Sequence, residues 1–123
     1  MEPTAKLAEV ADKLDIGHYS RHVFLCIGET CCTKEVGEAA WEALKKELKD
    51  RKLSLSREPG ACYRTKVGCL RVCLDGPILL VYPEGAYYYG MTAERIPEFV
   101  QKHLVDNEPQ TERIFARNPL RMV

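Results

Sequence analysis

The chain has 123 residues, which suits a single domain with a modest hydrophobic core. Hydrophobic residues make up 46% and charged residues 29% of the sequence, a balance typical of globular proteins and not of disordered or membrane-embedded chains. Lysine plus arginine equal aspartate plus glutamate at 18 each, and this zero net charge argues against a general attraction to nucleic acid or to an anionic membrane.

The first half of the chain predicts a helix, a strand and a long helix. Leu7, Val10 and Leu14 recur at helical spacing, which predicts a helix over residues 4–14. An apolar run predicts a strand over residues 22–27. A second helical pattern predicts a helix over residues 35–50, with its apolar positions at Val36, Ala40, Trp41, Leu44 and Leu48.

The second half predicts three strands and a closing helix. Alternation of Tyr63, Thr65 and Val67 with charged residues predicts a half-buried strand over residues 63–67. Two strands joined by a short hairpin turn are predicted over residues 78–82 and 86–90. A helix capped by Thr92 is expected to run to residue 104, with Pro97 acceptable only in its first turn. Residues 106–123 show no periodicity and are expected to wrap the surface.

This order of elements predicts one α/β domain over residues 1–123. A βαβ unit followed by a hairpin and a helix builds a four-stranded mixed sheet with helices packed on it. That is the element order of a thioredoxin-like fold. The core is expected over residues 22–104, with an extra N-terminal helix and a C-terminal tail as extensions.

The cysteines are the most informative residues. Cys26 ends the first predicted strand, Cys31 and Cys32 precede the long helix, and Cys69 and Cys73 follow the next strand. Two groups of thiols on two loops predict one site with four sulfur ligands, which selects zinc or an iron–sulfur cluster. A [2Fe–2S] cluster takes two thiolates per iron, so each loop would supply one pair.

These features together resemble the thioredoxin-like [2Fe–2S] ferredoxins, whose relatives include the small iron–sulfur subunit of respiratory complex I. The resemblance covers residues 22–104. Its markers, in the family's order, are a cysteine at the end of the first strand, a second before the helix, Cys69-x3-Cys73, Gly76-Pro77, an apolar strand, Tyr82-Pro-Glu-Gly85, an aromatic strand and a closing helix. The resemblance implies a one-electron carrier, not an enzyme, that holds a [2Fe–2S] cluster and serves redox partner proteins.

The resemblance also implies the ligand set and a homodimer. The implied ligands are Cys26, Cys32, Cys69 and Cys73, with Cys31 as the alternative to Cys32. Related sequences place a large apolar residue nine positions after the second ligand, and Trp41 lies nine after Cys32 but ten after Cys31. Thioredoxin-like ferredoxins are often paired, and the aromatic strand at residues 87–89 offers an apolar contact for a second copy.

Two other functions compete with this interpretation. A structural zinc site also takes four thiolates, although zinc ligands are usually paired two to four residues apart, closer than Cys26 and Cys32. A thiol–disulfide oxidoreductase on the same fold commonly carries Cys-x-x-Cys, and the sequence contains none. An all-cysteine ligand set predicts a low reduction potential, near the roughly −400 mV of plant-type ferredoxins.

The remaining candidate residues have supporting or structural interpretations. Gly28 and Gly68 are expected to let the two loops approach closely. Lys34 and Arg71 lie beside the expected ligands and would raise the potential slightly. Cys62 is interpreted as a buried packing residue. The histidines (His18, His22 and His103) are expected to be structural or exposed. No signal peptide and no apolar run of membrane-spanning length is found, so we expect a cytoplasmic protein.

Overall fold

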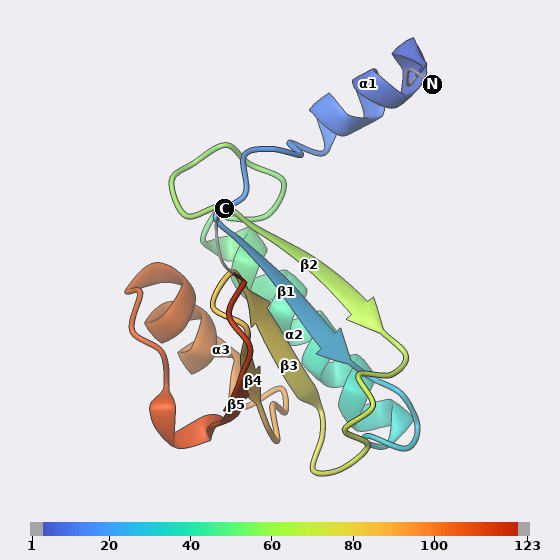
Figure 1. Cartoon of the computed structure of the whole chain (residues 1–123), viewed down its shortest axis with the longest axis vertical. Coiled ribbons are helices and arrows are strands. Elements are labelled where there is room, and N and C mark those ends of the chain that lie inside the picture. Colours follow the sequence, from blue (N-terminus) through green and yellow to red (C-terminus); the bar gives the residue numbers. More distant parts are fainter. Residues whose placement is uncertain (1–3, 121–123) are drawn as a thin grey trace.

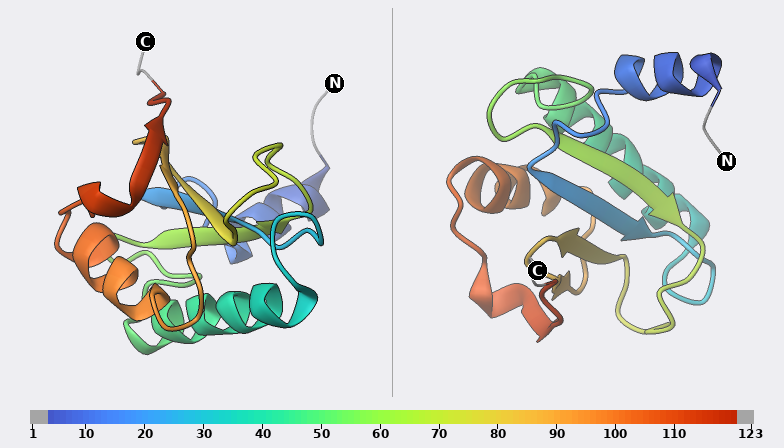
Figure 2. Two further views of the ribbon diagram at one scale, coloured as in Figure 1. Left: turned by 90° about the horizontal axis from the view of Figure 1, so that it is seen from below. Right: turned by 45° about the horizontal axis from the view of Figure 1, so that its top comes forward.

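The computed structural model describes residues 4–120, which form one mixed five-stranded sheet in the order β2-β1-β3-β4-β5. β1 pairs with β2 in parallel and with β3 antiparallel, and the pairs β3–β4 and β4–β5 are antiparallel. The helices α2, α3 and η1 pack against the same face of this sheet (Figures 1 and 2). The thioredoxin-like α/β prediction is thereby confirmed, with one more strand than expected.

The unit β1 (Arg21–Cys26), α2 (Lys34–Asp50) and β2 (Cys62–Val67) forms as the sequence predicts. Thr33 caps α2, because its side chain accepts a hydrogen bond of 3.2 Å from the N–H of Val36. One stripe of the helix is buried against the sheet, at Gly37, Ala40, Leu44 and Leu48. The parallel pairing of β1 with β2 puts the ends of both strands at the same edge of the sheet.

The hairpin of β3 (Ile78–Tyr82) and β4 (Ala86–Tyr88) is also confirmed, although β4 is shorter than predicted. Gly90 has a φ of +58°, a left-handed conformation that turns the chain away from the sheet. β3 lies in the middle of the sheet, and Ile78 to Val81 are all buried. Leu79 and Val81 belong to the main core, while Ile78 belongs to a smaller buried cluster with Cys26 and Cys31, and burial on both sides of the strand explains its unbroken apolar run.

The C-terminal part departs most from prediction. The expected helix over residues 92–104 begins later, as α3 (Ile96–Phe99), and continues as the π-helical η1 (Val100–Val105). The predicted cap at Thr92 is wrong, because Arg95 occupies the N-cap position. Pro97 therefore falls in the first turn of the helix, where its missing N–H costs no hydrogen bond.

The tail also differs from the expected surface wrap, within the part that the structure describes. It forms η2 (Thr111–Arg113) and β5 (Ile114–Arg117), and β5 adds a fifth strand beside β4. The prediction of four strands was therefore wrong by one. A four-residue strand is too short for alternation to reveal it, and only its pairing with β4 fixes it. Residues 121–123 of the tail lie outside the described residues.

The N-terminal helix α1 (Ala5–Lys13) forms between its cap residues Thr4 and Leu14, as predicted. It projects from the body of the protein (Figure 1), and it has no buried residue. Ion pairs of 2.7 Å from Arg57 to Asp12 and Asp15 connect the helix region to the loop before β2.

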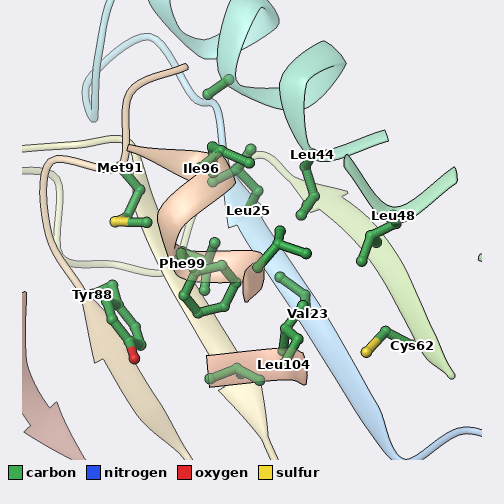
Figure 3. Packing of buried hydrophobic residues seen from close by; sticks show 14 of the residues in the cluster. Val23, Leu25, Leu44, Leu48, Cys62, Tyr88, Met91, Ile96, Phe99 and Leu104 are labelled. Carbon is green, nitrogen blue, oxygen red and sulfur yellow. The ribbon is translucent and has the colours of Figure 1, made fainter. Parts of the chain in front are cut away.

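The main core lies between the sheet and the helices α2, α3 and η1 (Figure 3). Leu25, Leu44 and Phe99 meet there, each with no exposed surface. Within residues 4–120, no helix is both long and apolar enough to cross a membrane.

Candidate metal centre

Two loops meet at the edge of the sheet where β1 and β2 end. The N–H of Ile27 donates to the carbonyl of Val67 over 3.0 Å, which extends the parallel pairing one residue into the loops. Beyond this bond, Gly28 lies so close to Gly68 that a Cβ on Gly28 would be 2.0 Å from the Gly68 carbonyl oxygen. The expected close approach at these glycines is therefore confirmed, and it needs a residue without a side chain at position 28.

The first loop brings three cysteines close together. The N–H groups of Cys31 and Cys32 both donate to the carbonyl of Gly28, over 2.9 and 3.2 Å, and this tight turn returns the chain toward Cys26. Cys26 and Cys31 are buried, whereas Cys32 is partly exposed at the start of α2. The first loop therefore offers Cys26 together with either of two adjacent thiols.

Burial is the main influence on the ionisation of Cys31 and Cys32. It raises the pKa of Cys31 to about 12, and the nearby Cys26 and Cys32 sulfurs add to the rise while a backbone hydrogen bond from Ile78 opposes it. Burial also raises the pKa of Cys32, with the Cys26 sulfur as a further cause. The free thiols of Cys31 and Cys32 are therefore neutral at physiological pH, and a metal that binds either of them must displace its proton.

The second loop carries the exposed cysteines. The sulfurs of Cys69 and Cys73 lie 4.0 Å apart, and the N–H of Arg71 donates to the Cys69 sulfur over 3.2 Å. Arg71, Cys73 and Asp75 all adopt left-handed φ angles, between +52° and +69°. Such conformations are uncommon for residues with side chains and often occur at functional sites. They wind the loop tightly and keep both sulfurs on its surface.

The two loops also touch at a second point, nearer the sulfurs. The N–H of Gly76 donates to the carbonyl of Cys31 over 3.0 Å. A Cβ on Gly76 would lie 2.2 Å from the Cys31 sulfur, so this thiol faces the second loop. The Cys32 sulfur instead lies against α2, 3.1 Å from where a Cβ on Gly37 would be.

The structure thus places the predicted ligands on two adjoining loops. Cys26, Cys31 and Cys32 form a more buried inner group, and Cys69 and Cys73 form an exposed outer pair. In residues 4–120, no three His, Cys, Asp or Glu side chains are already arranged to hold one metal ion. The donor set nevertheless suits a thiolate-bound cluster, since it supplies soft ligands in two pairs, backbone N–H donors to sulfur, and glycines where the loops meet.

The other predicted residues lie outside this centre. Cys62 is buried at the opposite end of β2, and its thiol donates to the Gly60 carbonyl over 3.2 Å, in agreement with a packing role. Trp41 is partly buried against the core, and Arg64 and Lys66 lie 5.2 and 5.9 Å from its ring. Lys34 is exposed beside the first loop.

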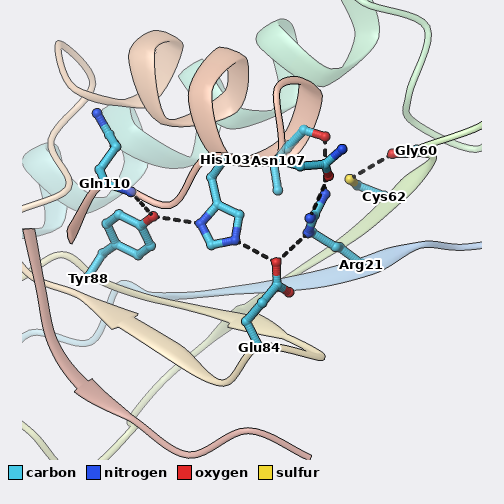
Figure 4. Close-up of polar contacts among 9 residues, drawn as sticks. Arg21, Gly60, Cys62, Glu84, Tyr88, His103, Asn107 and Gln110 are labelled. Atoms are coloured by element: carbon cyan, nitrogen blue, oxygen red, sulfur yellow. Dashed lines mark hydrogen bonds and ion pairs between the residues drawn. The ribbon is translucent and has the colours of Figure 1, made fainter.

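A buried polar network was not predicted from the sequence (Figure 4). His103 has no exposed surface, and it contacts the Tyr88 hydroxyl over 2.6 Å and the Glu84 carboxylate over 2.7 Å. Arg21 donates to the same carboxylate over 2.7 Å. An ionised carboxylate only accepts, so Nε2 of His103 donates to it and Nδ1 accepts from Tyr88. The histidine is structural, as expected, but nothing in the spacing identified its partners.

Comparisons with known proteins point to one group. No family model matches the chain. A curated [2Fe–2S] ferredoxin of Clostridium pasteurianum is 30% identical over 94 residues, covering 71% of this chain and 87% of that protein. A [2Fe–2S] ferredoxin of Aquifex aeolicus is 26% identical over 100 residues, covering 79% and 90%. A solved thioredoxin-like [2Fe–2S] ferredoxin from Aquifex aeolicus superposes with a TM-score of 0.69 at 23% identity, covering 83% of this chain and 96% of that one.

Proposed function

The chain belongs to the thioredoxin-like [2Fe–2S] ferredoxins, and we propose that Cys26, Cys32, Cys69 and Cys73 bind its cluster, with Cys31 as the alternative to Cys32. Membership makes the protein an electron carrier with a [2Fe–2S] cluster. The observation that supports the ligand set is the meeting of the two cysteine loops at one edge of the sheet, through Gly28 and Gly68. When bound, such a cluster accepts one electron and returns it.

The residues around the sulfurs have supporting roles in this proposal. Cys26 and Cys32 would hold one iron, and Cys69 and Cys73 the other. The Arg71 N–H already donates to the Cys69 sulfur, and such a hydrogen bond stabilises negative charge on sulfur. Because Cys69 and Cys73 are exposed, the second loop is the side on which a redox partner would approach most closely.

Different observations support the two candidates for the second ligand. Cys32 directly precedes Thr33, the N-cap of α2, where the positive end of the helix dipole favours a thiolate. Cys32 is also partly exposed, whereas Cys31 is buried. The Cys31 sulfur, in turn, faces Gly76 in the second loop. We choose Cys32 because Trp41 lies nine positions after it, which is the spacing found in related sequences.

The wider role of the protein in the cell is inferred from its family. We infer that the protein is not an enzyme, that it passes electrons between redox proteins in the cytoplasm, and that it works as a homodimer. The absence of any acid–base constellation in the predicted site is compatible with pure electron transfer. The aromatic strand supports the dimer, since Tyr87 is partly exposed and Tyr89 is 40% exposed, whereas Tyr88 is buried.

Metal analysis tests the function directly. Anaerobically purified protein should contain two iron and two acid-labile sulfide per chain and should be red-brown. A colourless protein with stoichiometric zinc would instead support the structural zinc site. Disulfide reductase activity without iron would support the oxidoreductase.

Paired alanine variants test the second ligand. Cys31→Ala should retain a normal visible spectrum after anaerobic reconstitution, and Cys32→Ala should lose or alter it. A normal spectrum in Cys32→Ala together with an altered one in Cys31→Ala would reverse the assignment.

A further inference from the structure

The edge strand β2 carries two positive charges on the face of the sheet that the helices cover. The pairing register sets Arg64 opposite Val23 and Lys66 opposite Leu25, and both of these β1 residues belong to the main core. Arg64 and Lys66 therefore lie on the side of α2, where the Arg64 guanidinium is 5.2 Å and the Lys66 ammonium 5.9 Å from the centre of the Trp41 ring. The two charges thus line the junction between the helix and the edge strand.

The Arg64 side chain lacks a partner of opposite charge. Its Nε is buried and has no hydrogen-bond partner, and it forms no ion pair within residues 4–120. A buried donor without a partner is costly. Contact with the Trp41 ring holds the guanidinium in place and leaves its N–H edges free, which suits the binding of an oxyanion such as a carboxylate.

Arg64 also forms one wall of a groove of about 610 Å³, which is otherwise lined mainly by charged residues of α2. Two lysines of this groove are paired with its two carboxylates, at 2.9 and 2.7 Å (Lys45 with Glu42, Lys46 with Asp50). Lys49 and Arg64 have no such partner in the part of the chain that the structure describes. The groove therefore has an excess of positive charge, although the whole chain has a formal net charge of zero.

The unpaired positive charges extend from the groove toward the second cysteine loop. Lys66 is exposed, has no ion pair among the described residues, and precedes Cys69 by three positions. In Figure 1 the last turn of α2, which contains Lys49, lies at the same end of the molecule as the start of β2. The charges therefore extend over most of β2, whose length is roughly 20 Å at 3.3 Å per residue. A small anion cannot contact both ends of such a line, whereas the surface of a protein can.

We propose that this basic surface, made of Lys49, Arg64 and Lys66, is the docking site of an acidic redox partner protein. The partner's carboxylates bind in the groove, and its redox centre faces Cys69 and Cys73. An interface of ordinary size, roughly 800 Å² on each protein, covers both the groove and the second cysteine loop. The inference rests on the proposed electron-transfer function and adds the charge of the partner, which that function leaves open. Complementary charges of this kind mainly accelerate the encounter of the two proteins.

Electron transfer from the cluster-loaded protein to two acceptors of opposite charge tests the proposal. The reduced protein is mixed in a stopped-flow instrument with flavodoxin, an acidic one-electron acceptor, or with cytochrome c, a basic one. At low ionic strength, where the Debye length is about 30 Å, Arg64→Gln and Lys49→Gln should each slow the transfer to flavodoxin about threefold to tenfold. The slowing should disappear in about 1 M salt, where the Debye length is about 3 Å. Transfer to cytochrome c should not become slower.

Lys102→Gln is the matched control for these variants. It removes the same charge from an exposed lysine of η1, which lies on the other side of α2 from β2 (Figure 1). Lys49 is exposed on α2, so Lys49→Gln stays informative if Arg64→Gln fails to fold by circular dichroism.

The outcomes separate this inference from the proposed function. Equal flavodoxin rates in the wild type and in both groove variants would overturn the docking site. Equal slowing in Lys102→Gln would overturn it too, because overall charge alone would then explain the effect, and so would slowing with both acceptors. Visible spectra and iron content of the same samples test the electron carrier separately. A wild type without iron would refute the proposed function, whereas normal spectra with unchanged rates would overturn only the docking site.

Discussion

Arg21 and Cys26 lie at opposite ends of β1, and the polar groups around these two residues are arranged in different ways. At the Arg21 end, Glu84, His103 and Tyr88 form a continuous chain of hydrogen bonds whose carboxylate accepts from both neighbours. At the Cys26 end, two loops carry the predicted ligand cysteines and approach each other closely at Gly28 and Gly68. In the first region the protein's own groups bond Oε2 of Glu84, both ring nitrogens of His103 and the Tyr88 hydroxyl, although Oε1 of Glu84 is buried without a partner. The second region offers ligands that a cofactor would complete.

The backbone shows the same contrast. Around the polar network the chain is held by regular elements, with Tyr88 on β4 and His103 on η1. In the second cysteine loop, Arg71, Cys73 and Asp75 are left-handed. Strain of this kind persists where surrounding contacts require it, and it is often found where a ligand binds. The molecule thus combines an end held by its own side-chain hydrogen bonds with an end shaped for its cofactor.

The largest effect is expected from removing one of the exposed ligands in the second loop. Cys73→Ser should strip the cluster or alter its visible spectrum strongly, because an alcohol is a poor substitute for a thiolate. Absorbance and iron analysis after anaerobic reconstitution measure the effect. Cys62→Ser is the matched control, since that thiol lies in the core at the other end of β2. Loss of the cluster in Cys62→Ser with retention in Cys73→Ser would refute the ligand set.

A second prediction concerns the contact between the loops. Gly28→Ala should reduce cluster content severalfold, because its Cβ would come within 2.0 Å of the Gly68 carbonyl oxygen and force the loops apart. Gly68→Ala is the control, since nothing lies within 4 Å of a Cβ at that position. Iron per chain measures both. Equal cluster content in the two variants would show that the close approach is dispensable.

Disrupting the polar network should lower the stability of the protein and leave its cluster content unchanged. His103→Leu leaves the Glu84 carboxylate and the Tyr88 hydroxyl without this partner, which should lower the free energy of unfolding by about 2–3 kcal/mol. Denaturant unfolding followed by circular dichroism measures the loss. The iron content of the folded variant should equal that of the wild type. A variant as stable as the wild type would mean that the network contributes nothing.

Acid should weaken the same network. Burial lowers the pKa of His103 below its ordinary value of 6.5, although Glu84 opposes this shift. The unfolded chain therefore takes up this proton first as the pH falls, so the folded state loses stability below about pH 6.5. Burial alone would raise the pKa of Glu84, but hydrogen bonds from His103 and Arg21 bring it below its ordinary value, which adds a loss at lower pH. Unfolding from pH 7.5 to 5 should show a smaller decline in His103→Leu than in the wild type.

The smallest expected effect is on the reduction potential. The midpoint of the wild type should be low, nearer the roughly −400 mV of all-cysteine ferredoxins than the Rieske range. Arg71→Asn removes one exposed positive charge and keeps a residue that tolerates the left-handed conformation. The potential should fall by roughly 10–40 mV at low salt and by less at high salt. A redox titration with paramagnetic resonance detection measures it, and an increase would contradict the electrostatic account.

The sequence by itself determined the local features of this protein. The apolar stripes of the helices, the hairpin and the cysteine positions at strand ends all depend on residues close together in the chain. The close approach of Gly28 and Gly68 was also predictable, because glycines beside ligand cysteines on two loops suggest contact. These features sufficed for the fold class and the kind of site.

Only the tertiary structure decided the features that join distant residues. β5 exists because β4 pairs with it, and the hydrogen bond between Glu84 and His103 joins a hairpin turn to a helical residue that lies 19 positions further along the chain. The placement of α2, α3 and η1 on one face of the sheet has the same origin, since helix amphipathicity shows that a helix packs but not on which side of the sheet. Such contacts carry no local pattern, because their energy comes from packing between elements whose sequences are independent.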